Sequence, residues 1–283
     1  MKSKIIESQS GLGVEISDLD LTKKVLKEDQ NQILKLWNKY SVAIFPNQTL
    51  SHTQFQNFSS FFGKYGDDPY LDSLKTNPHI VEVKRKAKEK AIQFGSTWHS
   101  DWSFQEKPPS ATLLHSKIIP PIGGDTLFAN TEKAYEDLSS GLKKEIDSLM
   151  VFHSAKRPYA VDGFYATEEI SDRSMKILPS KKAEKSFLHP LVRIHPITNK
   201  KSLFINPVYS IAIKDMNENK SERLLMKLYA HMLLDKYIYR HTWKENMLLV
   251  WDNRTVMHQA EGGYDGHERL LHRITIAGDQ PKN

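Results

Sequence analysis

Hydrophobic residues near the N-terminus recur with the periods of a strand, a helix and a second strand. Val14 and Ile16 alternate with polar residues, which predicts an opening strand and turn within residues 11–21. Apolar residues then recur at helical spacing over residues 28–40, and this stripe predicts the first helix. The apolar run at residues 41–45 predicts a short buried strand.

The second helix is predicted from its start signal and from its aromatic residues. Ser51 and Gln54 have the spacing of a capping box, in which each side chain satisfies a backbone N–H at the helix start. Phenylalanines follow at positions 55, 58, 61 and 62. This spacing favours a helix whose aromatic face packs in the core.

The rest of the chain predicts mainly strands. We expect strands at residues 80–83, 111–119, 188–194, 202–205, 237–243, 247–251 and 269–276, and helices at 131–138, 141–150 and 218–234. Strands and helices do not alternate regularly, which argues for an antiparallel sandwich or barrel wrapped by helices. Residues 67–96 and 155–186 break the pattern, and we expect two lid-like excursions within a single domain spanning residues 1–283.

Composition narrows the possible chemistry. The chain has 283 residues and no cysteine, which excludes disulfide scaffolds, thiolate metal sites and cysteine nucleophiles. Its net charge is +6, but the lysines are interleaved with acidic residues, so we expect no nucleic-acid partner. No apolar segment resembles a signal peptide or a membrane span, so we expect no membrane partner and a cytoplasmic protein.

Candidate metal ligands begin with His99 and Asp101. If they lie on a strand or a strand end, side chains two residues apart leave the same face and converge on one point. Such a pair is expected nearly once by chance in a chain with 12 histidines, so it needs support from elsewhere. His258 follows the apolar strand predicted at residues 247–251 and a polar segment, which suits a ligand at a strand mouth. Two histidines and one carboxylate on one face of a metal are typical of non-haem Fe(II) oxygenases.

Two arginines add a possible anion site. Arg269 and Arg273 lie on the same face of the predicted last strand, together with Leu271 and Thr275. They are either exposed to solvent or line a pocket. A guanidinium matches a carboxylate bidentately, so an interior pair would bind an acidic cosubstrate and an acidic substrate.

Six motifs in order resemble a known family. They are W-H-S-D at residues 98–101, G-G-D-T at 123–126, L-H-P-L-V-R-I-H-P at 188–196, L-F-I-N at 203–206, W-D-N-R followed by His258, and R-L-L-H-R at 269–273. Together they resemble the taurine dioxygenase / 2,4-dichlorophenoxyacetate dioxygenase family of Fe(II)- and 2-oxoglutarate-dependent oxygenases. The resemblance runs over nearly the whole chain.

The resemblance implies a double-stranded β-helix, or jelly roll, wrapped by helices. It implies that His99, Asp101 and His258 bind Fe(II), and that Thr126 and Arg269 hold the distal carboxylate of 2-oxoglutarate. With O2, such an enzyme hydroxylates a small acidic substrate, either a sulfonate, a sulfate ester, an aryloxy acid or another carboxylic acid. The cosubstrate becomes succinate and CO2.

The substrate pocket departs from the taurine-type pattern. The resemblance implies that Arg273 binds the acidic group of the substrate and that Tyr209 packs against it. Gly95 stands where taurine-type members have an asparagine, and the loop that ends at Tyr70 lacks their histidine. We therefore expect substrate contacts at Gly95 and Tyr70 and a substrate other than taurine, in a homo-oligomer that is a dimer or a tetramer.

Two other functions use the same residues. A zinc hydrolase would hold a metal-bound water on the same His, Asp and His face, although Arg269 and Arg273 argue mildly against it. A cupin-like module would bind a small acid without turnover.

Overall fold

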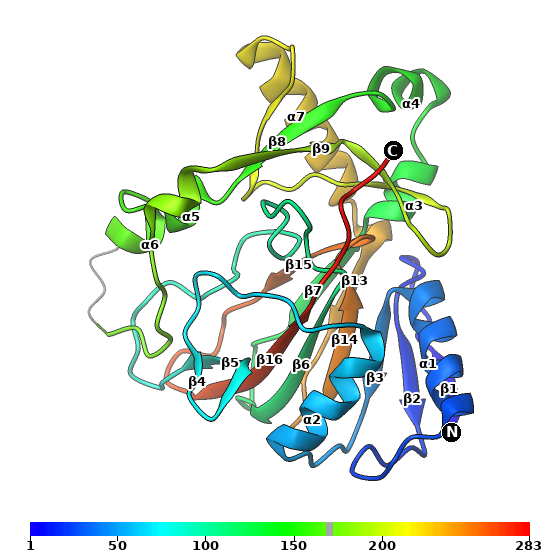
Figure 1. Cartoon of the computed structure of the whole chain (residues 1–283), viewed down its shortest axis with the longest axis vertical. Coiled ribbons are helices and arrows are strands. Elements are labelled where there is room, and N and C mark those ends of the chain that lie inside the picture. The colour runs from blue at the N-terminus through cyan, green and yellow to red at the C-terminus, as the bar shows by residue number, and fades with distance from the viewer. Residues whose placement is uncertain (168–171) are drawn as a thin grey trace.

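The computed structural model describes residues 1–167 and 172–283, and a large antiparallel sheet occupies its centre (Figure 1). Among the described residues, the only parallel pairing in this sheet joins its second and third strands. The eight strands lie in the order β1 (Lys2–Ile5), β2 (Val14–Ser17), β3 (Val42–Phe45), β14 (Leu248–Asp252), β6 (Ala111–Ile118), β16 (Arg269–Ile276), β5 (Asn77–Arg85) and β4 (Ser73–Leu74).

Smaller sheets complete the β structure. One has the order β13 (Ile238–His241), β7 (Thr126–Asn130) and β15 (Val256–Ala260); another has β12 (Ser210–Ile213), β8 (Met150–Ser154) and β9 (Ser186–Pro190); a third pairs β10 (Val192–Ile194) with β11 (Lys201–Leu203). β14 belongs to the large sheet and β15 to a small one, and only residues 253–255 separate them. The predicted antiparallel, mainly β architecture is confirmed.

Helices cover the sheets on two sides (Figure 1). α1 (Lys27–Tyr40) and α2 (His52–Ser59), which η1 (Ser60–Phe62) extends, pack on the large sheet, while α3 (Thr131–Glu136), α4 (Ser140–Ile146), α7 (Glu218–Met232) and η3 (Asp235–Tyr237) gather near the small sheets. The predicted capping box is confirmed, because Ser51 and Gln54 each bond the other's backbone N–H. Within the described part of the chain, no helix has the length and apolar character needed to cross a bilayer.

Several strands are absent from the prediction. They are β1, β4, β7, β8, β12 and β15. Four of them carry polar residues at buried positions, namely Thr126, His153, Ser210 and His258, and these residues break the apolar alternation that marks a strand. The helix predicted at residues 141–150 ends at Ile146, and the strand predicted at 188–194 is interrupted at Leu191.

The two predicted excursions contact one another. The first contains β4 and β5 of the large sheet, so only its flanks are loops. The second contains α5 (Lys156–Tyr159), α6 (Phe164–Thr167) and η2 (Lys181–Glu184), and its residues 168–171 lie outside the described part. The backbone N–H of Ser174 donates to the buried Glu89 carboxylate at 2.9 Å. This contact joins the first excursion to the second, while lid movement stays a prediction.

Buried histidines make the fold sensitive to acid. Burial lowers the pKa of His115, His189 and His272 to about 4, and that of His241 to about 3. All four side chains are buried. The neutral imidazoles fit the core, and protonation opposes folding.

Acidification should therefore destabilise the protein. The pKa of an unfolded histidine is about 6.5, so between about pH 4 and 6.5 the unfolded chain binds more protons than the folded one. We expect the free energy of unfolding to fall by at least about 1 kcal/mol from about pH 7 to about pH 5, as measured by urea denaturation. His115→Gln should flatten this dependence, whereas a change at the exposed His79, His79→Gln, should not. A stability that rises on acidification would contradict the prediction.

Candidate metal centre

Two histidines distant in sequence are held together by backbone hydrogen bonds. The N–H of His99 donates to the carbonyl of His258 at 3.0 Å, and the N–H of His258 donates to the carbonyl of His99 at 2.7 Å. Their ring centroids are 4.2 Å apart. His258 lies in the middle of β15, which corrects the predicted position at a strand mouth.

Asp101 completes a cluster of three buried ligand groups. Its Oδ1 atom lies 3.6 Å from Nε2 of His99 and 3.8 Å from Nε2 of His258. One ligand atom from each residue lies within 4.8 Å of the other two. The convergence of His99 and Asp101 that their spacing predicts is thus confirmed. His99 lies in an isolated β-bridge with His258, and Asp101 lies in a turn two residues later.

Neighbouring groups orient these ligands. Nδ1 of His99 donates to the carbonyl of Thr97 at 2.7 Å, which leaves the Nε2 lone pair available for a metal. The hydroxyl of Thr112, on β6, donates to Oδ2 of Asp101 at 2.7 Å. Burial and the adjacent His99 together lower the pKa of His258 to about 3. The neutral imidazole that a metal requires is therefore the stable form of His258.

The carboxylate of Asp101 is charged despite its burial. Burial alone raises its pKa, but Arg273, His258 and His99 together hold the pKa well below its usual range. Two imidazoles and one carboxylate on one side of a point leave open positions opposite. This donor set fits a divalent metal such as Fe(II), and it also fits Zn(II).

Arg269 is a buried cation without a carboxylate partner among the described residues. Its side chain is 5% exposed, and its Nη2 atom donates to the carbonyl of Gly124 at 3.2 Å, while Nε has no partner in that part of the chain. Burial lowers its pKa. A buried charge is costly unless it is paired, so this position fits an anionic ligand.

The anion site and the metal cluster border the same cavity. Its lining includes His99, His258, Thr126 and Arg269. The hydroxyl of Thr126 accepts from Nε1 of Trp243 at 2.9 Å, so its own hydrogen can be donated to a ligand. A small dianion can therefore reach from Arg269 and Thr126 to the metal cluster.

Arg273 also faces inward, but its guanidinium already pairs with two carboxylates. Its Nη1 atom donates to Oδ1 of Asp101 and its Nε atom to Oδ1 of Asp68, both at 3.0 Å. Asp68 is fixed in turn, because Nε1 of Trp102 at 2.7 Å and the hydroxyl of Thr275 at 3.0 Å donate to the same oxygen. Of the two alternatives that the sequence leaves open for the arginines of β16, the structure shows the buried one that lines a pocket. Nη2 is the only nitrogen of Arg273 without a partner among the described residues.

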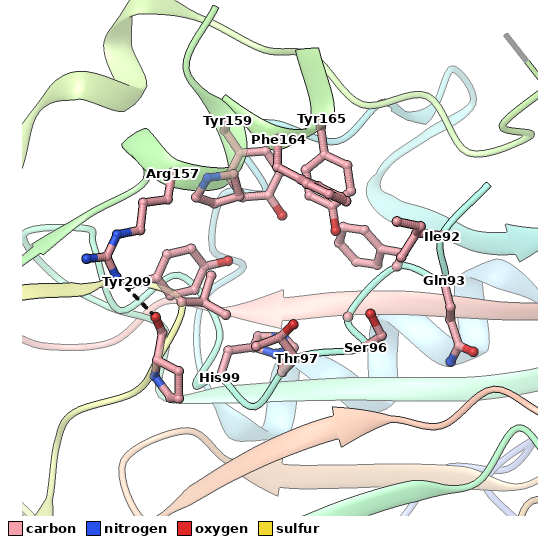
Figure 2. A pocket seen from close by; sticks show the side chains of 15 residues that line it. Ile92, Gln93, Ser96, Thr97, His99, Arg157, Tyr159, Phe164, Tyr165 and Tyr209 are labelled. Carbon is pink, nitrogen blue, oxygen red and sulfur yellow. Dashed lines mark hydrogen bonds between the residues drawn. The ribbon is translucent and has the colours of Figure 1, made fainter. Parts of the chain in front are cut away.

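A larger cavity of about 410 Å³ opens above His99 (Figure 2). Its walls are mainly aromatic and include Tyr159, Phe164, Tyr165 and Tyr209. Tyr209 is 2% exposed and presents its ring edge to His99, with centroids 6.4 Å apart. The position predicted for Tyr209 therefore borders this cavity.

Gly95 borders both cavities. Its φ of +73° favours glycine, and a Cβ there would lie 3.5 Å from Cε1 of His99. A longer side chain at this position would extend beside a candidate metal ligand. The glycine thus leaves this side of the cavity open.

Tyr70 is not among the described residues that line the large cavity, which differs from the predicted substrate contact. Its ring stacks on Tyr159 with centroids 4.7 Å apart, so it supports the wall from behind. The sequence pattern does not predict that Asp68 pairs with Arg273, and it does not predict the cavity-wall residues of α5 and α6. The only signal for them was the lack of periodicity in the two excursions.

Other polar residues near the core have structural partners. His195 lies 2.9 Å from Oδ2 of Asp252, and Arg254 donates to that carboxylate at 2.7 Å. His189 lies 2.9 Å from the carbonyl of Gln105. These contacts give both histidines and Arg254 structural roles.

Comparison with known proteins agrees with this geometry. The family described as Taurine catabolism dioxygenase TauD, TfdA family matches residues 4–275. The Alkylsulfatase of Acinetobacter baylyi is 30% identical over 269 residues, covering 95% of this chain and 83% of that protein. The Alpha-ketoglutarate-dependent sulfate ester dioxygenase of Pseudomonas putida is 27% identical over 275 residues, covering 95% and 88%. The structure of AAD-2 in complex with Mn(II) and N-oxalylglycine matches with a TM-score of 0.80 at 28% identity, covering 100% of both chains. The predicted jelly-roll fold is thereby confirmed.

The three-residue cluster predicts one divalent-metal site per chain. We expect calorimetric titration with Mn²⁺ to show one bound ion, and His99→Ala to weaken binding by at least about 100-fold, because loss of an outer-shell partner alone costs about 10- to 100-fold. His79→Ala, which changes an exposed histidine, serves as the control. Equal Mn²⁺ affinity in both variants would show that His99 does not bind the metal.

Proposed function

Because the chain belongs to the TauD/TfdA family of 2-oxoglutarate-dependent dioxygenases, we propose that His99, Asp101 and His258 bind Fe(II). The observation that supports this most strongly is the buried cluster of three ligand atoms within 4.8 Å of one another. The set leaves one side of the metal open for cosubstrate and O2. The neutral imidazole of His258 and the charged carboxylate of Asp101 are the protonation states that the metal needs.

We propose that Arg269 and Thr126 bind the distal carboxylate of 2-oxoglutarate. Arg269 offers a buried guanidinium with an unpartnered Nε, and Thr126 offers a hydroxyl hydrogen. A charge-assisted pair at this end orients the cosubstrate so that its other end faces the His, Asp and His cluster. Both residues would act by binding and positioning, without exchanging a proton.

Bound Fe(II), with 2-oxoglutarate and O2, supplies the oxidising power that converts a substrate C–H bond to C–OH while the cosubstrate becomes succinate and CO2. This chain's residues position the substrate and exclude water from it. The aromatic walls formed by Tyr159, Tyr209 and Phe164 suit the apolar part of an organic acid. Two relatives are named as an alkylsulfatase and a sulfate ester dioxygenase, which favours acids of this general class.

Several features predicted from the sequence stay predictions. The contact between Arg273 and the acidic group of the substrate stays a prediction and would depend on Nη2, the nitrogen left without a partner in the described chain. The homo-oligomer, the cytoplasmic location and the single-domain organisation with two lids also stay predictions.

The cosubstrate site can be tested by a change that leaves the metal ligands intact. We expect Arg269→Ala to raise the KM for 2-oxoglutarate by about 10- to 100-fold, since a hydrogen bond to a charged group contributes about 1.5–3 kcal/mol. Mn²⁺ affinity should stay unchanged. The matched control is Arg240→Ala, which removes a half-exposed arginine that pairs with Glu261. An unchanged KM for 2-oxoglutarate in Arg269→Ala would exclude this role.

The activity can be tested by adding Fe(II), 2-oxoglutarate and O2 to the purified protein with a panel of small organic acids. We expect succinate to form and O2 to be consumed. A zinc hydrolase would consume no O2, and a binding module would turn nothing over. Absence of succinate with every acid, together with no binding of 2-oxoglutarate, would overturn the assignment.

A further inference from the structure

We propose that the substrate places its acidic group beside Arg157, at the outer part of the aromatic cavity, and an apolar carbon beside the metal. In this arrangement the Asp68–Arg273 pair rejects an acidic group from the metal end, so the contact with Arg157 replaces the predicted contact between Arg273 and the substrate acid. The inference rests on the proposed function and deepens it, because it assigns the orientation and class of the substrate. The class is an organic monoanion, carboxylate or sulfate, with an extended apolar body.

The metal end of the site has little capacity for a further anion. The side chains of Arg273 and Asp68 are 4% and 8% exposed, and Asp101 holds a second nitrogen of Arg273. Asp68 cannot turn away without breaking its bonds to Trp102 and Thr275. A substrate acid on Arg273 would therefore lie close to the buried carboxylate of Asp68, which is not a proposed metal ligand, and this is unfavourable.

The large cavity contains a different cation. Among its described lining residues, Arg157 is the only lysine or arginine, there is no aspartate or glutamate, and Arg273 is absent. Within the described residues, Arg157 makes one hydrogen bond, to the carbonyl of Pro207 at 3.4 Å, which is long for such a bond. Figure 2 shows the guanidinium beyond Tyr209, at the edge of the cavity, whereas His99 lies at its base. Arg157 can therefore turn to an anion without leaving a strong partner.

The wall between these two points is apolar. Tyr159, Phe164, Val208 and Tyr209 line it, and the cavity volume of about 410 Å³ lies within the range of about 300–1,000 Å³ that is usual for small-molecule sites. An acid held by Arg157 would lay its hydrocarbon part along these side chains towards His99. The carbon that reaches the metal would then be separated from the acidic group by several bonds.

This orientation predicts the product. The substrate, 2-oxoglutarate and O2 give the hydroxylated acid, succinate and CO2, and no bond to the acidic group breaks. If the acid instead lay beside the metal, hydroxylation of the carbon that bears a sulfate would give an aldehyde and free sulfate. Whether the acidic group is retained or released therefore shows where it binds.

The first experiment compares short and long acids with the wild-type enzyme. The probes are decanoate and decyl sulfate on one side, and ethyl sulfate and taurine on the other. We expect succinate with the two long acids, hydroxydecanoate substituted away from the carboxyl group, and hydroxylated decyl sulfate without release of sulfate. Free sulfate from decyl or ethyl sulfate, or preference for the short acids, would overturn the inference.

Two variants test the residues separately. We expect Arg157→Gln to raise the KM for decanoate by about 10-fold with little change in kcat, because it removes binding common to the ground and transition states. Arg223→Gln, which changes an exposed arginine of α7, is the control. Asp68→Asn keeps the size of the side chain and a carbonyl acceptor while it removes the charge on Arg273's partner. It should raise kcat/KM for ethyl sulfate by at least about 10-fold without altering the KM for 2-oxoglutarate.

Failure of this inference is distinguishable from failure of the proposed function. The proposed function fails if 2-oxoglutarate does not bind and no acid yields succinate. The inference alone fails if 2-oxoglutarate binds but decanoate neither reacts nor raises the melting temperature of the anaerobic Mn²⁺ complex. It also fails if Arg157→Gln and Arg223→Gln have the same KM for decanoate.

Discussion

The candidate site depends on the pair of backbone hydrogen bonds that joins His99 to His258. This bridge attaches a loop to β15, and β15 pairs along its length with β7, which carries Thr126. The third ligand, Asp101, is fixed from the large sheet instead, by Thr112 of β6 and Arg273 of β16. The three ligand groups therefore converge because two sheets hold the same loop from opposite sides. A metal would find its ligands already oriented, which reduces the cost of ordering them on binding.

Two arginines on one strand serve opposite electrostatic purposes. Arg269 and Arg273 are four residues apart on β16 and are equally inaccessible to solvent, yet Arg269 has no carboxylate partner in the described chain and Arg273 has two. The first can bind an anionic cosubstrate, because burial without a partner leaves its charge uncompensated. The second instead holds Asp101 and Asp68 in place. Burial alone does not separate these roles; the carboxylates that surround each guanidinium do.

The sequence predicts those parts of the site that depend on local geometry. The two-residue spacing of His99 and Asp101 and the shared strand face of Arg269 and Arg273 follow from the β-strand period, and the structure agrees with both. The partners supplied by loops could not be predicted. Asp68 reaches Arg273 from 205 residues away, and Arg157 belongs to a segment without hydrophobic periodicity, so only the folded chain places them. The sequence predicts a strand mouth at His258 because the polar residues 252–255 precede it, although these residues are buried in the fold.

We propose that the cluster of His99, Asp101 and His258, together with Arg269, carries out 2-oxoglutarate-dependent oxygenation. The sharpest test is mass spectrometry of the succinate that the Fe(II)-loaded enzyme forms under ¹⁸O₂ in ordinary water. We expect succinate that carries one labelled oxygen atom, because one atom of O2 enters the cosubstrate as it loses CO2. Unlabelled succinate, or conversion of a substrate with no consumption of O2, would show that this proposal is wrong.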